Sequence, residues 1–227
     1  MPTPWQPGPA RPRLDAETVD VWLIALDCEQ PRDPLSEEER ERATRFVRDE
    51  DGRRWAAART ALRVLLAAYA EADPRELSFA EGLHGKPALA AEKDAAASRL
   101  RFNLSHSGDA GLIAVALDRE IGVDVELPRR AVDHVAIARR VLNEDEAERI
   151  AALEDPRERE RAFLRAWVRW EAVLKCRGTG IGSAETVLTE PEPWVVELPI
   201  APPAAAALAV TGGPVAVQTW RWPPAVA

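Results

Sequence analysis

The chain has 227 residues, of which 46% are apolar and 30% are charged, a composition that predicts a globular protein with a well-buried core. The formal net charge of −8 argues against nucleic acid as the main partner, because binding a polyanion depends on Lys and Arg side chains that neutralise phosphates. The only cysteines are Cys28 and Cys176, which supports neither a disulfide framework nor a zinc site and fits a reducing cytoplasm. No stretch approaches the roughly 20 apolar residues of a membrane span, so we expect no membrane partner.

The N-terminal part of the sequence predicts a strand followed by helix. Residues 1–13 are rich in proline and are expected to form a flexible leader. Residues 19–26, VDVWLIAL, have strand composition, and the region 31–70 has a helical pattern. Ser36 followed three residues later by Glu39 is typical of a capping box, which predicts a helix start at this point.

The rest of the chain alternates runs of strands with a cluster of helices. The predicted strands cover 99–105, 112–118, 121–127, 186–190, 194–198 and 208–220, and the predicted helices cover 136–153 and 155–175. The first three of these strands would form an antiparallel meander that brings His106, Asp124 and Glu126 to one edge. Because helices and strands are segregated in this way, the sequence predicts an α+β fold.

Asp124 and Glu126 in IGVDVE are the most informative pair of polar residues. They alternate with Val123 and Val125, and since strand side chains point to opposite faces with period two, the two carboxylates should share a face. A solvated strand face is one interpretation of such a pair. The other is a site for a hard divalent cation, because the cation would relieve the repulsion between the acids. We expect Mg²⁺ and a substrate that carries phosphate.

Glu171 and Lys175 lie on the predicted helix 155–175. With Phe163 at the centre of the apolar face, both residues fall on its flank, and their spacing of four residues makes them neighbours. They could form an ordinary helix ion pair. A flank position also points toward an adjoining sheet, where two further carboxylates would be available.

Other polar residues allow more than one interpretation. His106 in FNLSHSG could be an ordinary loop histidine, and Lys86 in GKP a solvated cation. Ser105 and Ser107 flank His106, but no GxSxG pattern surrounds them, so a serine hydrolase is not indicated.

Four short segments occur in this order: GKPAL (85–89), FNLSHSG (102–108), IGVDVE (121–126) and WVRWEAVLKCRGTGI (167–181). Taken together, they resemble the Sfp-type 4'-phosphopantetheinyl transferases. The stretch RFVRDEDGRRWAAARTALR (45–63) is similar to that family as well. The joint occurrence of these segments at this spacing makes chance a poor explanation.

The resemblance implies a monomer of two similar α+β halves related by pseudo-twofold symmetry, with the active site and coenzyme A in the cleft between them. The halves would cover 14–117 and 118–227. Asp124, Glu126 and Glu171 would hold Mg²⁺ against the pyrophosphate of coenzyme A. The other residues expected to contact coenzyme A are Lys86 and Pro87 at the adenine end, Ser105 and His106 at the phosphorylated ribose or pyrophosphate, Lys175 at the phosphates, and Arg42, Arg54 and Arg59 at the 3'-phosphate.

The activity that the resemblance implies is transfer of 4'-phosphopantetheine from coenzyme A to a serine of an apo acyl or peptidyl carrier protein domain, with release of 3',5'-ADP. The serine hydroxyl would attack the β-phosphorus while the metal and Lys175 neutralise the growing charge. Glu171 would accept the serine proton, and Glu171, Lys175 and His106 are the expected catalytic residues.

One departure from the family pattern leaves alternatives open. Members usually have WxxKEA, whereas this chain has WVRWEA with Trp170 at the position of the lysine. A degenerate module that binds coenzyme A or a carrier domain without catalysis is therefore one alternative. A Mg²⁺-dependent phosphodiesterase or nuclease would use similar carboxylates, but the net charge of −8 argues against the basic groove it would need. Retention of the three acids and Lys175 favours an active transferase.

Overall fold

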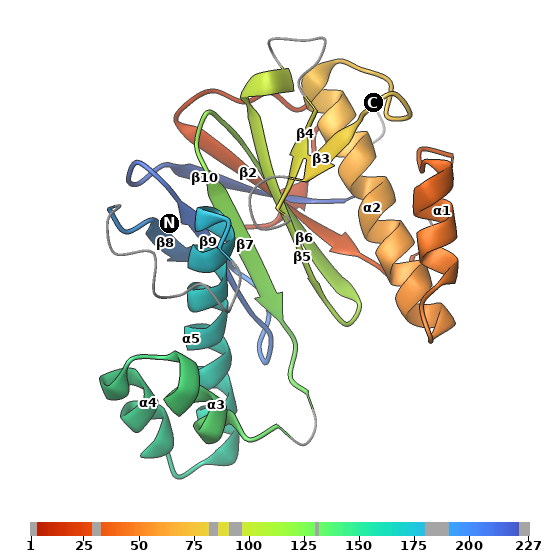
Figure 1. Ribbon diagram of the computed structural model, residues 1–227. Coiled ribbons are helices and arrows are strands. Elements are labelled where there is room, and N and C mark those ends of the chain that lie inside the picture. Colours follow the sequence, from red (N-terminus) through yellow and green to blue (C-terminus); the bar gives the residue numbers. More distant parts are fainter. Residues whose placement is uncertain are drawn as a thin grey trace.

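The computed structural model describes residues 4–28, 33–81, 86–90, 97–129, 132–179 and 191–222 (Figure 1). The described elements mix helices with three sheets, so the expected α+β class is confirmed. The strand expected at 186–190, residues 1–3 of the leader, Gly85 and residues 180–181 of the family-like segments lie outside the described residues.

The larger sheet has the strand order β1-β10-β2-β6-β5. Its strands are β1 (Gln6–Pro7), β10 (Ala216–Arg221), β2 (Thr18–Ala25), β6 (Ala110–Leu117) and β5 (Leu100–Ser107). β10 is parallel to both β1 and β2, whereas β6 is antiparallel to β2 and β5. A second sheet consists of the short antiparallel strands β3 (Phe79–Glu81) and β4 (Pro87–Leu89), and a 3-10 turn (Ala97–Arg99) precedes β5.

Helices α1 (Glu37–Thr44) and α2 (Asp49–Ala70) lie together on one side of the larger sheet (Figure 1). The start of α1 confirms the predicted capping box, because Ser36 Oγ accepts a hydrogen bond from the Glu39 amide and the Glu39 carboxylate accepts one from the Ser36 amide. The apolar stripe of α2, which includes Leu62, Leu65 and Leu66, packs in a core with the sheet.

The third sheet has the order β7-β9-β8, with β7 (Ile121–Glu126), β9 (Ala205–Val210) and β8 (Trp194–Glu197) all antiparallel to their neighbours. Helix α5 (Pro156–Arg177) covers this sheet and contacts α3 (His134–Val141) and α4 (Glu144–Ala151). α5 ends at Gly178, as expected, because this residue adopts the left-handed conformation that terminates helices.

The predicted antiparallel meander is only partly correct. β5 and β6 form the expected hairpin, but β7 pairs with β9 and lies beside β5 without a backbone ladder. The helix expected over 136–153 is divided into α3 and α4, because Leu142 is extended and Asn143 caps a new helix by accepting a hydrogen bond from the Glu146 amide.

The chain termini also differ from the expectation. Within the leader expected to be flexible, Gln6–Pro7 pair with β10, and Trp5 Nε1 donates to the Pro199 carbonyl at 2.6 Å. Gly8 lies so close to Trp22 that a Cβ atom would be 2.0 Å from its ring. This part of the segment is therefore packed. The last strand, β10, belongs by sequence to 118–227 but is hydrogen bonded to strands of the first 25 residues.

Candidate active site

Strands β5 and β7 meet along a contact made by side chains, which we call the seam. Three alternate residues of β5 bond to β7: Asn103 accepts from the amide of Val123, Ser105 donates to Asp124 and Ser107 donates to Glu126, each at 2.8 Å. Both serine bonds span 19 residues, so the two strands run parallel. The seam therefore aligns the side chains of β5 with the two carboxylates of β7.

Gly122 explains how helix α5 reaches these carboxylates. A Cβ atom on Gly122 would lie 2.1 Å from the carbonyl oxygen of Ala172 and 2.3 Å from the amide of Cys176. The helix backbone can cross the strand this closely only because no side chain intervenes. Since Gly122, Asp124 and Glu126 alternate along β7, both acids share the face on which α5 lies, as the sequence predicts.

Asp124 is the most buried of the three predicted metal ligands, Asp124, Glu126 and Glu171, with 3% of its surface exposed. Its Oδ1 accepts hydrogen bonds from Lys175 Nζ at 2.5 Å and from Ser105 Oγ at 2.8 Å, while its Oδ2 has no hydrogen-bond partner. Burial raises the pKa of Asp124 above its ordinary value, and Lys175, Ser105 and the backbone amide of Val125 offset only part of this effect. A buried carboxylate oxygen without a partner is costly unless something else binds there.

Glu126 and Glu171 complete the set of acids. Glu126 is half-buried and accepts hydrogen bonds from Ser107 Oγ and from Arg129. The pKa of Glu171 is raised first by burial and then by repulsion from Asp124 and Glu126, which Lys175 partly offsets. Glu171 is therefore close enough to both β7 carboxylates to be repelled by them, and Lys175 is the cation beside it.

The acids do not form a ready-made metal site. In the part of the chain that the structure describes, no group of three or more His, Cys, Asp or Glu side chains is already arranged to hold an ion. Lys175 Nζ lies against one oxygen of Asp124 instead. The free Asp124 Oδ2 and an all-oxygen donor set still suit a hard divalent cation such as Mg²⁺.

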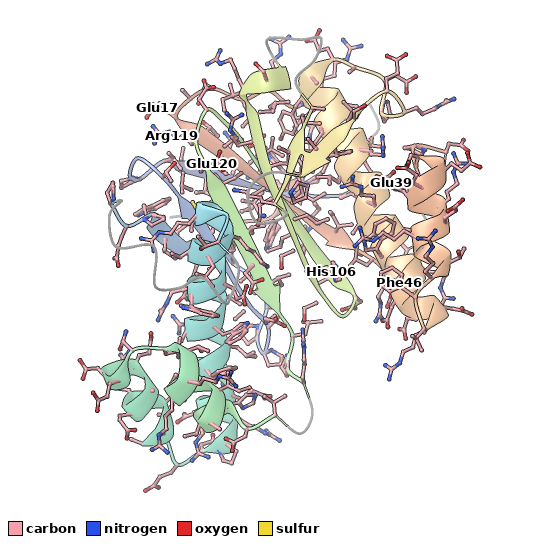
Figure 2. The ribbon with its side chains drawn as sticks, in the orientation of Figure 1. Glu17, Glu39, Phe46, His106, Arg119 and Glu120 are labelled. Atoms are coloured by element: carbon pink, nitrogen blue, oxygen red, sulfur yellow. The ribbon has the colours of Figure 1, made fainter. Side chains whose placement is uncertain are left out.

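His106 does not join the acids in the seam. It follows Ser105 on β5 and therefore points to the opposite face of the strand. Figure 2 shows it at the end of the β5–β6 hairpin, on the side toward α2. Its pKa lies below the ordinary value because of desolvation and because Lys175 and Arg129 repel the protonated ring.

Lys86 and Pro87 line a cavity of about 440 Å³ near the start of β7. Lys86 Nζ donates to Glu120 Oε2 at 2.8 Å and to the Ile121 carbonyl at 3.0 Å, so its charge is paired. Cys176 lies on the same wall, where burial raises the pKa of its thiol to about 11. Lys86 therefore contacts the start of β7, whereas Asp124 and Glu126 lie toward the end of the same strand.

The arginines predicted to bind the 3'-phosphate have protein partners. Arg54 forms two hydrogen bonds to Asp27, at 2.6 and 3.0 Å, and an ion pair with Glu50. Arg59 is paired with Glu39 and lies 3.8 Å from the centroid of the Phe79 ring. Arg42 stacks over Trp55 and lines a surface cavity of about 570 Å³. Arg42 is the one of the three that no carboxylate is seen to neutralise among the described residues.

Trp170 precedes Glu171 on α5 and lines a different surface of the helix. Its ring centroid is 5.2 Å from that of Trp167, and it lines a separate cavity of about 360 Å³ between α5, α4 and β8. Neither the seam carboxylates nor Lys175 line this cavity. The tryptophan that replaces the usual lysine therefore forms part of the wall of this cavity.

Sequence reasoning missed the seam residues Asn103 and Ser107. The signal for them was the period of two in FNLSHSG, which places residues 103, 105 and 107 on one face. Recognising their role also required the pairing of β5 with β7, which the expected meander did not contain.

Comparison with known families identifies the class of protein. The N-terminal family model of 4'-phosphopantetheinyl transferases matches residues 18–118, and the 4'-phosphopantetheinyl transferase superfamily model matches residues 120–200. The chain belongs to the 4'-phosphopantetheinyl transferase family.

Individual relatives agree with this assignment. The chain is 37% identical over 199 residues to the 4'-phosphopantetheinyl transferase HetI of a Nostoc species, which covers 83% of this chain and 82% of the relative. A putative 4'-phosphopantetheinyl transferase of a Synechocystis species is 35% identical over 71% of this chain and 65% of its own length. The human L-aminoadipate-semialdehyde dehydrogenase-phosphopantetheinyl transferase is 28% identical over 71% of this chain and 52% of its own length.

Proposed function

We propose that this chain transfers 4'-phosphopantetheine from coenzyme A to a serine of an apo carrier protein domain, with release of 3',5'-ADP. Membership of the transferase family supports this activity. The observation that carries the proposal for the site is the buried Asp124, which is paired with Lys175 of α5 and keeps one oxygen without a partner. The site takes its substrates from two chemical classes, a diphosphate ester and a protein hydroxyl.

The proposed metal is Mg²⁺, and Asp124, Glu126 and Glu171 are the residues that would hold it. When bound, the ion would neutralise charge on the diphosphate and on the leaving group. Lys175, which pairs with Asp124 Oδ1, would be a second cation beside the site. Its side chain is 29% exposed, which leaves the ammonium room to turn toward a phosphate oxygen.

Glu171 is the proposed acceptor of the serine proton. As the serine oxygen forms its bond to the β-phosphorus, the bond from phosphorus to the bridging oxygen breaks and 3',5'-ADP leaves with the electron pair. The raised pKa of Glu171 makes it a stronger base than an exposed glutamate, and the carboxylate would pass the proton to solvent. Lys175 would stabilise the negative charge that develops on the leaving oxygen.

Coenzyme A would extend from the acids along both neighbouring surfaces. Lys86 and Pro87 would meet the adenine end, and His106, on the α2 face of β5, would meet the phosphorylated ribose or the pyrophosphate. Ser105 would also contact the phosphorylated ribose or the pyrophosphate, although its hydroxyl donates to Asp124 in this structure. Arg42 is better placed for the 3'-phosphate than Arg54 and Arg59, which carboxylates hold.

We further propose that the chain is Sfp-type, a cytoplasmic monomer of two halves, 14–117 and 118–227, related by pseudo-twofold symmetry. Each half contributes a 22-residue helix, α2 or α5, that packs on a sheet, and the seam lies between the two sheets. Within the described residues, none of the helices has both the length and the apolar character needed to cross a bilayer.

Intact-mass measurement tests the activity. Several purified apo acyl and peptidyl carrier domains would be incubated with coenzyme A, Mg²⁺ and this protein, and we expect at least one carrier to gain one phosphopantetheine group. The gain should vanish when EDTA replaces Mg²⁺. Absence of any gain, together with retained binding of coenzyme A, would favour the non-catalytic module instead.

A further inference from the structure

Ser107 ends β5 with its side chain in the interior, where 3% of the residue is exposed. Its hydroxyl donates to Glu126 Oε2 at 2.8 Å and accepts from the amide of Leu127 at 3.1 Å. A serine hydroxyl has a single proton to donate, so the contact with the amide fixes the direction in which that proton points. Ser107 is therefore held on one side by the backbone of β7 and presents a donor to the carboxylate on the other.

The two oxygens of Glu126 have different surroundings. Oε2 receives Ser107 and Arg129, the latter at 3.0 Å, whereas Oε1 has only a contact of 3.4 Å with Arg129 among the described residues. Arg129 is 66% exposed, so water competes with its contact. Ser107 is thus the buried, fixed donor to this carboxylate, and it leaves Oε1 available to another ligand.

Gly108 brings Ser107 into this position. The residue has φ +56°, and a Cβ atom there would lie 2.7 Å from Leu127 Cδ1. Only glycine adopts this backbone conformation without strain and also allows the turn to approach Leu127 so closely. The turn between β5 and β6 therefore packs closely against Leu127, and the end of β5 lies beside Glu126 at the end of β7.

We propose that Ser107 is a positioning residue for the transfer reaction: it orients the Glu126 carboxylate so that Oε1 faces the bound divalent cation. The inference rests on the proposed function of the acid site and extends it to a residue that touches neither substrate. Hydrogen bonds to metal-binding carboxylates commonly change metal affinity by about 10- to 100-fold when they are removed. Ser105 has a similar place beside Asp124, but its oxygen also lies 3.1 Å from Lys175 Nζ, so its removal would change two contacts at once.

The test measures the affinity of the full-length protein for MnCl₂ by electron paramagnetic resonance, without coenzyme A or carrier. S107A should raise the Kd for Mn²⁺ about tenfold. S107C, which keeps the size but loses the strong donor, should do the same, and S107T, which keeps the hydroxyl, should stay within about threefold of the wild type. T60V is the matched control. Thr60 lies in the N-terminal half, away from the acids, and its Oγ1 is a buried hydroxyl without a hydrogen-bond partner, so its removal should leave the Kd for Mn²⁺ unchanged.

The outcomes separate this inference from the proposed function. If S107A and S107C are folded by circular dichroism and bind Mn²⁺ as tightly as the wild type, the role of Ser107 is overturned even when phosphopantetheine transfer is observed. A wild-type protein that binds Mn²⁺ but modifies no carrier would refute the proposed function, while weakened binding in S107C would still support positioning. A wild-type protein that binds no Mn²⁺ at millimolar concentration would overturn the inference.

Discussion

Glu39 in the N-terminal half and Asp124 at the seam are both carboxylates in the interior, and each faces basic side chains, but they are satisfied to different degrees. Glu39 receives Arg59 on one oxygen, and Arg63 at 2.6 Å and the Ser36 amide at 2.9 Å on the other. Figure 2 shows it between α1 and α2. Asp124 receives Lys175 and Ser105 on one oxygen and nothing on the other.

The pKa values of the two residues shift in opposite directions. Burial alone would raise the pKa of Glu39, but hydrogen bonds from Arg63, the Ser36 amide and Arg59 hold it below its ordinary value. For Asp124, burial outweighs Lys175, Ser105 and the backbone amide of Val125, and the pKa is raised. Both oxygens of Glu39 accept hydrogen bonds, and the residue links α1 to α2. Asp124 has one oxygen without a hydrogen-bond partner, and that oxygen is available to a ligand.

The substitution D124N should have the largest effect on catalysis. It removes a charge from the proposed metal site, and we expect kcat/KM for carrier modification to fall by about a thousandfold, the scale of losing one preorganised electrostatic contact. The free energy of unfolding should change little, because the substitution removes an incompletely paired buried charge. Activity is measured by coenzyme A-dependent carrier modification and stability by urea unfolding. Retained activity would show that Asp124 is not in the metal site.

The substitution E39Q should show the opposite profile. It leaves Arg59 and Arg63 in the interior without their carboxylate, and we expect the free energy of unfolding to fall by about 3 kcal/mol with kcat unchanged in the folded protein. Urea unfolding and single-turnover transfer measure the two quantities. A loss of activity larger than the loss of folded protein would contradict the structural role of Glu39.

The pH dependence of stability gives a second measure of Glu39. Because its pKa is lower in the folded state, the stabilisation is present above the ordinary value of 4.5 and is lost as the pH falls below that value through the folded-state pKa. The melting temperature of the wild type should therefore fall more steeply than that of E39Q as the pH is lowered. Parallel curves for the two proteins below pH 4.5 would show that Glu39 has no lowered pKa.

Replacing Lys175 sharpens the comparison at the site itself. Lys175 is the cation that now occupies Asp124, so K175M should tighten the binding of Mn²⁺ by about tenfold while it slows transfer, because one positive charge near the ion is removed. K86M is the matched control, since Lys86 pairs with Glu120 instead. Its affinity for Mn²⁺ should equal that of the wild type. Weaker binding in K175M would show that Lys175 supports the ion and does not compete with it.

The smallest effect is expected for W170K, which restores the usual family residue. Position 170 lines the cavity between α5, α4 and β8, so transfer should change by less than about threefold, while loss of the contact with Trp167 lowers the free energy of unfolding by about 1 kcal/mol. A large gain in kcat would show that a cation at position 170 reaches the phosphates.

Local features of the fold could be predicted from the sequence. The capping box at Ser36 and Glu39, the end of α5 at Gly178 and the common face of Asp124 and Glu126 all depend on residues a few positions apart. Such patterns follow from backbone geometry and local hydrogen bonds, which the sequence specifies directly.

Long-range pairing could not be predicted in the same way. Helical spacing placed Lys175 beside Glu171, but its closest carboxylate is that of Asp124, 51 residues away in the chain. The partner of β7 was likewise mistaken, because strand composition does not specify which neighbouring strand completes the ladder. The role of Ser107 depends on that pairing, so it became visible only in the structure.

The position of β10 has a consequence for biosynthesis. β10 is the last strand of the described chain, yet it lies between β1 and β2 and is hydrogen bonded to both. A nascent polypeptide leaves the ribosome N-terminus first, so one edge of β2 stays open until Ala216–Arg221 have been synthesised. The larger sheet therefore closes only after β10, which follows β2 at a long distance in the chain, has been translated.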